Sequence, residues 1–165
     1  MANALFQVPY PVNEPVKNYA PGSPERAEVK KVLAELSKKQ IDVPMFIGGK
    51  EVKTKKTKKM VSPHNHKHVL GTHAMGGASH VKDAIDAALK ARKEWSELAW
   101  EQRAAIFLKA ADLLAGPYRA RMNAATMLAQ SKSIYQAEID AACEMIDFLK
   151  FNVQYASEIY TEQPE

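Results

Sequence analysis

The segment from Ser133 to Tyr160 constrains the fold more than any other part of the chain. Ser133 and Gln136 fit a capping box, so a long helix is predicted to start at Ser133 and to continue to Tyr160. A surface helix needs only one apolar stripe, but this one carries two, so we expect part of it to be covered by a partner chain or by further chain. The first stripe holds Ile139, Ala142, Ile146, Leu149, Val153 and Ala156, and the second holds Phe148, Phe151 and Tyr155.

Four other helices are predicted from cap residues and from apolar residues that recur at helical spacing. A glycine followed by proline, at Gly116-Pro117, marks the end of one of them. The first predicted helix starts at a Ser23 cap and ends near Gln40, and the second starts at a Ser79 cap and includes Trp95. The third runs from about Ala99 to Leu114, and the fourth from about Pro117 to Ala129.

Residues 41–73 have the character of short strands rather than helices. Gly48-Gly49 permits the positive φ angles of a tight hairpin turn between Val43–Ile47 and Glu51–Val52. Lys59–Ser62 and Lys67–His73 are predicted to flank a second turn at residues 63–66. The expected fold class is therefore mainly α with a small antiparallel β element, preceded by a proline-rich arm at residues 1–22.

The single cysteine, Cys143, excludes an internal disulfide, and no apolar run approaches the roughly 20 residues of a membrane helix. Residues 1–20 contain three prolines and Glu14 but no arginine, which matches neither a secretory nor a mitochondrial signal. We therefore expect a cytoplasmic protein with no membrane partner.

The net charge of +4 comes from one short segment. Lys50 to Lys59 holds six lysines and Glu51, a local charge of +5, so the rest of the chain carries −1. Such a segment could bind phosphate backbones, but it lacks arginine and interleaved aromatic residues. We interpret it as a solvated hairpin edge that lysine protects from aggregation, and expect no nucleic-acid partner.

Four histidines lie within ten residues, and alternate residues of a strand share one face, so a metal site is conceivable. No cysteine and no suitably spaced carboxylate accompanies them, and polar turn residues are the favoured interpretation. Cys143 is interpreted as a packing residue, because it lies within a helix beside an acid that would raise its pKa. The histidines are His64, His66, His68 and His73.

Several stretches spread over most of the chain form a recognisable set. They are Asn13-Glu14-Pro15-Val16, Tyr19-Ala20-Pro21-Gly22-Ser23-Pro24-Glu25-Arg26, Val61-Ser62-Pro63-His64-Asn65-His66, Ala91-Arg92-Lys93-Glu94-Trp95, Ile106-Phe107-Leu108-Lys109-Ala110-Ala111-Asp112-Leu113-Leu114 followed by Gly116-Pro117, Gln136-Ala137-Glu138-Ile139-Asp140-Ala141-Ala142 and Ile146-Asp147-Phe148. Together they resemble the pyrroline-5-carboxylate dehydrogenases, also called L-glutamate γ-semialdehyde dehydrogenases, of the aldehyde dehydrogenase superfamily. Several of these stretches exceed six residues, which makes chance a poor explanation.

The resemblance implies that the chain is the N-terminal portion of an α/β aldehyde dehydrogenase fold whose Rossmann-like sheet is absent here. Residues 23–165 would supply the first helices and the β-hairpin of an incomplete NAD-binding domain. The family is several times longer and uses a nucleophilic cysteine in a Gly-Gln-x-Cys context, a glutamate base and a glycine-rich cofactor loop. All of these would lie past Glu165, so no catalytic, metal or cofactor residue is expected in this chain, and Cys143 is not the nucleophile.

One functional position carries over by resemblance. Glu144 occupies the place of a family glutamate on the helix that borders the tunnel through which the aldehyde arrives. The resemblance implies that Glu144 binds the ammonium group of the substrate. The alternative is that Glu144 is an ordinary exposed helix acid.

The leading hypothesis is an N-terminal fragment, inactive alone, of an NAD-dependent dehydrogenase that oxidises L-glutamate γ-semialdehyde to L-glutamate in proline catabolism. Its partner would be the remainder of the aldehyde dehydrogenase chain or a complementary subunit, with NAD bound only by the full-length enzyme, a homo-oligomer. The alternative is a non-catalytic helical docking module that binds a complementary dehydrogenase fragment or itself.

Overall fold

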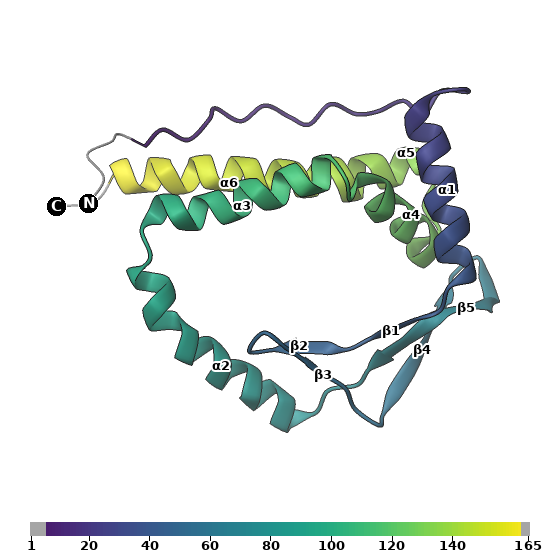
Figure 1. Cartoon of the computed structure of the whole chain (residues 1–165), viewed down its shortest axis with the longest axis horizontal. Coiled ribbons are helices and arrows are strands. Elements are labelled where there is room, and N and C mark those ends of the chain that lie inside the picture. Colours follow the sequence, from purple (N-terminus) through teal and green to yellow (C-terminus); the bar gives the residue numbers. More distant parts are fainter. Residues whose placement is uncertain (1–5, 163–165) are drawn as a thin grey trace.

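The computed structural model describes residues 6–162, so residues 1–5 of the arm and the final Gln163-Pro164-Glu165 lie outside it. The described chain is mainly helical with two small sheets, which confirms the predicted fold class (Figure 1). The helices are α1 Pro24–Lys38, α2 Ala78–Glu97, α3 Trp100–Ala115, α4 Arg119–Gln130, α5 Ile134–Ala137 and α6 Glu144–Thr161, with a π-helical segment η1 at Glu138–Cys143. The strands are β1 Ile41–Val43, β2 Met45–Ile47, β3 Lys50–Val52, β4 Thr57–Ser62 and β5 Asn65–Ala74.

Two of the three predicted helix caps are present. The Ser23 hydroxyl accepts a hydrogen bond from the Arg26 amide, and Ser133 forms the expected reciprocal capping box with Gln136. The prediction for Ser79 is wrong, because α2 already starts at Ala78 with Gly77 as its cap. The Gly77 amide donates to Nδ1 of the His80 imidazole over 3.1 Å, so a side chain one turn into the helix satisfies it.

The predicted helix from Ser133 to Tyr160 is interrupted by η1. In an α-helix, residues five apart point about 140° away from each other, since each residue turns about 100°. The wider π-helical turn brings Glu138 and Cys143 to the same side of the helix, where both are buried together with Ala142. The sequence pattern predicts the helix but not this change of phase.

The strands form a three-stranded sheet in the order β1-β5-β4 and a separate β2-β3 hairpin. The hairpin turn at Gly48-Gly49 has positive φ at both glycines, as predicted. The predicted single strand from Val43 to Ile47 is divided at Pro44, which lacks the amide hydrogen needed for a continuous ladder. Val43 instead ends β1, which pairs in parallel with β5, so this sheet is mixed rather than wholly antiparallel.

A glycine makes the pairing of β1 with β5 possible. At Gly71 the φ angle is 152°, and a Cβ atom there would lie 1.9 Å from the backbone oxygen of Ile41. Only a residue without a side chain therefore allows these two strands to approach each other.

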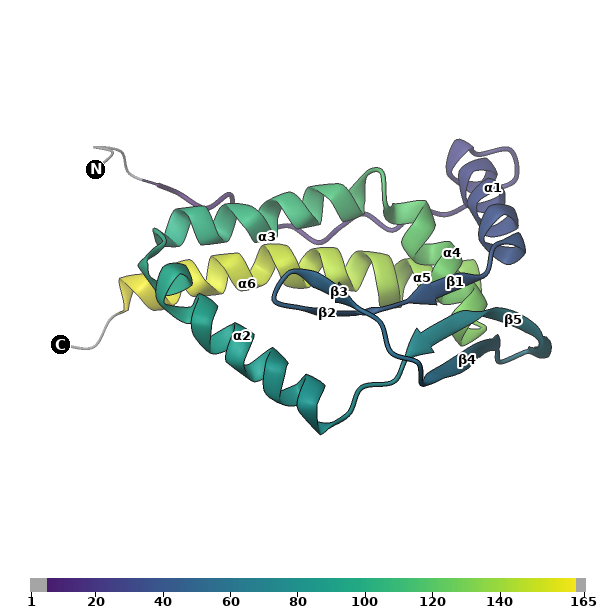
Figure 2. The ribbon, with the colours of Figure 1, turned by 60° about the horizontal axis from the view of Figure 1, so that its bottom comes forward.

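Helices α3 and α6 lie side by side, and the arm follows them before it turns into α1 (Figures 1 and 2). Helix α1 packs across α4, and α4 contacts β4. A small core forms where the end of the arm meets α1 and α4, around Tyr19, Val29 and Ala124. The arm is thus part of the fold and not only a surface extension.

Large apolar side chains remain exposed on α6 and α2. Within residues 6–162, Ile146 and Val153 of the first predicted stripe on α6 are buried, whereas Phe148 and Tyr155 of the second are 62% and 51% exposed. Along α2, Val81, Ile85 and Leu89 are all more than half exposed on one face. These faces agree with the expectation that more than the described chain covers the helices. No helix among the described residues is long and apolar enough to cross a membrane.

Candidate functional site

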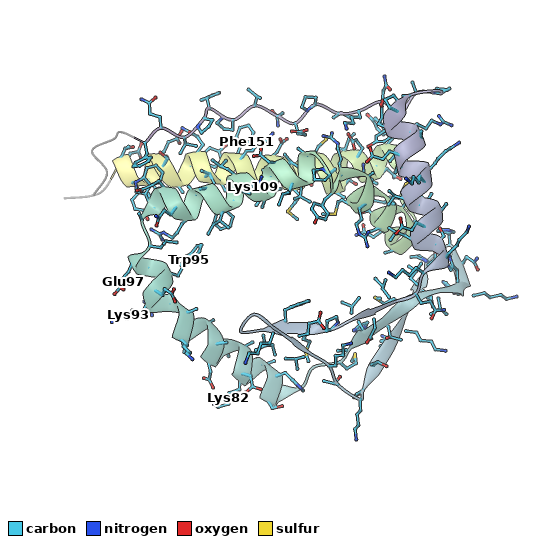
Figure 3. All side chains as sticks on the ribbon, in the orientation of Figure 1. Lys82, Lys93, Trp95, Glu97, Lys109 and Phe151 are labelled. Atoms are coloured by element: carbon cyan, nitrogen blue, oxygen red, sulfur yellow. The ribbon has the colours of Figure 1, made fainter. Side chains whose placement is uncertain are left out.

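Glu144 lies at the start of α6, exposed, in a groove with a volume of about 430 Å³. Most of the lining comes from one face of α6, and the arm supplies the rest. Figure 3 shows the Phe151 side chain between α6 and the arm. The groove is lined by Asn13, Glu144, Asp147, Phe148, Phe151, Asn152 and Tyr155.

The arm engages the second carboxylate of this groove. Asn13 Nδ2 donates to Asp147 Oδ2 over 2.8 Å, and the Glu14 amide donates to Asp147 Oδ1 over 2.7 Å. Across residues 6–162, by contrast, no hydrogen bond or ion pair involves the Glu144 carboxylate. The groove therefore presents one unengaged carboxylate beside aromatic rings, an arrangement that suits an organic cation.

Next to the groove, a buried polar network holds the arm against the helices. Glu138 of η1 is fully buried and forms an ion pair with Arg119 of α4. The Glu138 carboxylate also accepts hydrogen bonds from the Tyr19 hydroxyl over 2.7 Å, from Asn123 Nδ2 over 2.7 Å and from the Lys17 amide over 2.9 Å. Lys17 and Tyr19 belong to the arm, so their two hydrogen bonds to this carboxylate hold the arm in place.

Glu14 joins the same network from the arm. Its carboxylate pairs with Arg119 through one oxygen and accepts from Lys150 Nζ over 2.7 Å through the other. Arg119 also donates to the Pro15 carbonyl over 2.7 Å. The ammonium group of Lys150, one turn after Asp147 on α6, is thereby directed to the arm.

The pKa values of the network follow from these contacts. Burial alone would raise the pKa of Glu138, but hydrogen bonds from Arg119, Lys17, Tyr19 and Asn123 outweigh it and lower the pKa below its usual value. The pKa of Glu14 is lowered in the same way: burial alone would raise it, but hydrogen bonds and charge from Lys150 and Arg119 outweigh burial. Burial and the Glu138 carboxylate both raise the pKa of Tyr19. The network is thus held as two carboxylates, one guanidinium and a neutral phenol.

Cys143 belongs to this buried cluster. Arg119 Nη2 lies 3.4 Å from its Sγ atom, and burial followed by the charge of Glu138 raises the pKa of the thiol. The sequence points to the neighbouring Glu144 as the acid responsible, but after burial it is Glu138, brought close by the π-helical turn, that raises this pKa most. A buried thiol with a raised pKa is a packing group, in agreement with the sequence-based interpretation.

Three of the four histidines, His64, His68 and His73, lie within hydrogen-bond distance of separate backbone or hydroxyl oxygens. His64 Nδ1 lies 2.7 Å from Ser131 Oγ, and His68 Nε2 lies 2.8 Å from the Ser37 carbonyl oxygen. In the described part of the chain, no three His, Cys, Asp or Glu side chains gather where they could hold a metal ion. The Ser131 and Ser37 contacts show that His64 and His68 tie the sheet to the ends of α4 and α1.

The lysines of residues 50–59 are all exposed. Lys58 and Lys59 lie on β4, an edge strand of the three-stranded sheet, and Lys53 pairs with Asp42 at 3.7 Å. This placement agrees with the interpretation of a lysine-protected sheet edge.

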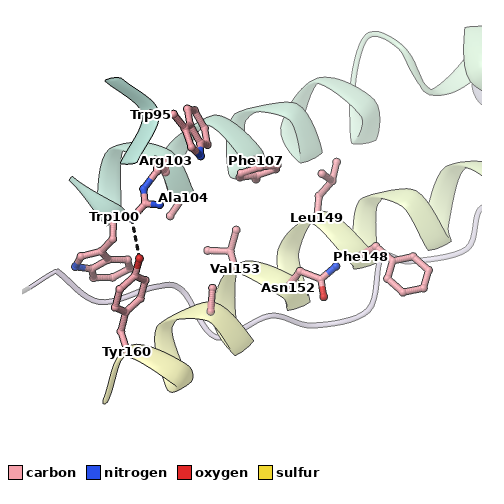
Figure 4. Close-up of a pocket in the computed structure, with 11 residues that line it drawn as sticks. Trp95, Trp100, Arg103, Ala104, Phe107, Phe148, Leu149, Asn152, Val153 and Tyr160 are labelled. Carbon is pink, nitrogen blue, oxygen red and sulfur yellow. Dashed lines mark hydrogen bonds between the residues drawn. The ribbon is translucent and has the colours of Figure 1, made fainter. Parts of the chain in front are cut away.

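A second hollow, of about 410 Å³, is lined by Trp95 near the end of α2, the start of α3, and α6 from Phe148 to Tyr160 (Figure 4). Its walls are mostly aromatic and aliphatic, with Arg103 Nη2 donating to the Tyr160 hydroxyl over 2.7 Å at one end. The Trp100 and Tyr160 rings pack there with centroids 5.8 Å apart. An open apolar hollow of this kind adds to the uncovered surface of α6.

The sequence patterns did not predict the contacts of the arm with α4 and α6. Asn13 and Glu14 stand in a stretch that carries the family resemblance, but their bonds to Asp147, Arg119 and Lys150 span more than 100 positions. No local pattern encodes such a contact.

Known proteins resemble this chain over nearly its whole length. A delta-1-pyrroline-5-carboxylate dehydrogenase of Agaricus bisporus is 48% identical over 162 residues, and the mitochondrial delta-1-pyrroline-5-carboxylate dehydrogenase of Homo sapiens is 47% identical over 152. These matches cover 98% and 92% of this chain but only 30% and 27% of the two relatives, so the chain spans less than a third of their length.

The fold agrees with a solved structure of the same kind. The crystal structure of the delta-pyrroline-5-carboxylate dehydrogenase from Mycobacterium tuberculosis, bound with NAD and cobalamin, is 48% identical with a TM-score of 0.96. The match covers 100% of this chain and 31% of that one. In addition, the model of the aldehyde dehydrogenase family matches residues 50–165. With 116 of its 165 residues inside that match, the chain belongs to the aldehyde dehydrogenase family.

Proposed function

We propose that this chain forms the N-terminal part of an NAD-dependent dehydrogenase that oxidises L-glutamate γ-semialdehyde (pyrroline-5-carboxylate) to L-glutamate in proline catabolism. One observation carries the proposal: at 48% identity, 98% of the chain matches about 30% of a relative named for this activity. Residues 23–165 are then part of the NAD-binding domain, and the remaining aldehyde dehydrogenase chain is the partner that covers α6 and α2.

This proposal assigns the oxidation chemistry to the remaining part of the enzyme. The described residues form no large parallel sheet and no glycine-rich phosphate-binding turn, so they offer NAD no recognisable site. The only described thiol, Cys143, is buried with a raised pKa. Under this proposal the chain contributes substrate binding and support, and is inactive alone.

Glu144 is the substrate-binding residue of the proposal. It is an exposed carboxylate in a groove with Phe148 and Tyr155 and is not engaged by any group of the described chain. A carboxylate in this setting forms a charge-assisted hydrogen bond with an ammonium group, and neighbouring aromatic rings favour the same charge. Both features match the amino group that distinguishes glutamate semialdehyde from simple aldehydes.

A chimera tests the proposed function. Residues 1–165 replace the matching segment of the M. tuberculosis relative, and NAD reduction is followed with pyrroline-5-carboxylate as substrate. We expect the chimera to be active and the isolated 165-residue chain to be inactive. The proposal would be contradicted by a folded chimera that does not oxidise pyrroline-5-carboxylate, or by NAD reduction by the isolated chain.

The alternative of a non-catalytic docking module makes a different prediction. A docking module would bind a complementary dehydrogenase fragment or itself without supporting turnover, so it would fail in the chimera. The homo-oligomeric state of the full enzyme and the cytoplasmic location remain predictions, and the human relative is named as mitochondrial. Size measurement of the chimera and localisation of the tagged full-length protein test them.

A further inference from the structure

The arm contributes an acceptor to the groove of Glu144. Asn13 lines this groove, and its side chain is oriented by its contact with Asp147. An ionised carboxylate only accepts hydrogen bonds, so the amide of Asn13 has to present Nδ2 to Asp147, over 2.8 Å. Its other atom, Oδ1, is left without a partner among residues 6–162, and it can only accept.

We propose that Oδ1 of Asn13 is a second acceptor for the ammonium group of the substrate, in the same groove as the Glu144 carboxylate. This inference rests on the proposed function, because it concerns the same substrate in the same groove. An ammonium group has three donors, so one carboxylate leaves it partly unpaired, and an acceptor from a second element completes its shell.

The neighbouring charges support this division of roles. Asp147 is held by two donors of the arm, Asn13 Nδ2 and the Glu14 amide. Lys150 is paired with Glu14 and so does not neutralise the acids of the groove. Glu144 remains as the charged acceptor, and Asn13, fixed by Asp147, remains as the neutral one.

Reversing the polarity of Asn13 without changing its shape is the sharpest test. In Asp147→Asn, the new side chain keeps an oxygen for the Glu14 amide and turns an NH₂ group toward Asn13. The Asn13 amide then rotates to accept that hydrogen bond and presents its own NH₂ to the groove, where it repels an ammonium group. In Asn13→Ala the acceptor is removed outright.

The measurement uses the active chimera and two substrates, glutamate semialdehyde and 5-oxopentanoate, which lacks only the amino group. We expect Asn13→Ala and Asp147→Asn each to raise KM for glutamate semialdehyde roughly fivefold, the loss of about one hydrogen bond, with kcat nearly unchanged. KM for 5-oxopentanoate stays as in the parent. Asn18→Ala is the matched control, since the Asn18 side chain bonds the nearby Ala20 amide, over 3.0 Å.

Each other result overturns the inference. Equal changes in KM for both substrates would show that Asn13 only anchors the arm. An unchanged KM in both variants, while Glu144→Ala raises KM for the amino-bearing substrate, would remove Asn13 from the site and leave the proposed function intact. Failure of the proposed function itself is seen separately, as inactivity of the parent chimera toward pyrroline-5-carboxylate.

Discussion

Arg119 and Glu138 form an ion pair that is almost completely shielded from solvent, with the two side chains 4% and 0% exposed. Arg119 stands on α4 and Glu138 on η1, and the arm completes the pair through Glu14, Pro15, Lys17 and Tyr19. The pair therefore joins the helices to a segment that precedes them by about a hundred positions.

Removing the charge of Glu138 should destabilise the chain strongly. Glu138→Gln leaves the Arg119 guanidinium buried without its main partner, and breaking a buried pair in this way costs about 3–5 kcal/mol. The measurement is urea unfolding followed by circular dichroism. The control is Asp140→Asn, which breaks the more exposed pair with Lys132 and should cost no more than about 1 kcal/mol. Equal losses in the two variants would argue against a structural role for the buried pair.

Acid should release the arm. The folded-state pKa values of Glu138 and Glu14 lie below the ordinary value of 4.5, so the unfolded chain takes up protons first as the pH falls. Their contribution to stability is complete above about pH 5.5 and declines as the pH drops through 4.5 toward the folded-state pKa values. Unfolding free energies measured from pH 7 to pH 3 should show this decline, and Glu14→Gln should make it shallower.

Gly71 should tolerate no side chain. In Gly71→Ala the new methyl group meets the Ile41 carbonyl oxygen, so β1 has to separate from β5. We expect a loss of about 3 kcal/mol in unfolding free energy. Gly49→Ala is the comparison, because its φ of 76° is also positive but nothing lies within 4 Å of a Cβ atom there. That change should cost only about 1–2 kcal/mol, the strain of the left-handed conformation.

Replacement of a serine should affect stability differently at the starts of α5 and α2. Ser133→Ala removes the acceptor of the Gln136 amide and should cost about 1 kcal/mol. Ser79→Ala lies inside the first turn of α2, not at its cap, and should change stability by no more than about 0.5 kcal/mol. Thermal or urea unfolding of both variants measures the difference. A similar loss of stability in Ser79→Ala would indicate that Ser79 does cap α2.

Local chemistry in the sequence was enough to predict much of the fold. The Ser23 and Ser133 caps, the Gly48-Gly49 turn and the helical apolar spacing depend on neighbours in the chain, so these elements could be predicted without tertiary information. The two stripes of α6 likewise predicted a helix that the described chain leaves uncovered on one side. Ser79 was a wrong prediction because a histidine one turn later satisfies the Gly77 amide.

Only the tertiary structure decided how the arm contributes to the groove on α6. The family resemblance led to Glu144, but it did not show that Asn13 lies in the same groove or that Asp147 is already engaged. The π-helical phase that buries Glu138 and Cys143 together, and the parallel pairing of β1 with Gly71, were equally hidden. Sequence alone determines what neighbouring residues prefer, whereas partners more than a hundred positions apart are selected by the free energy of burying the whole network at once.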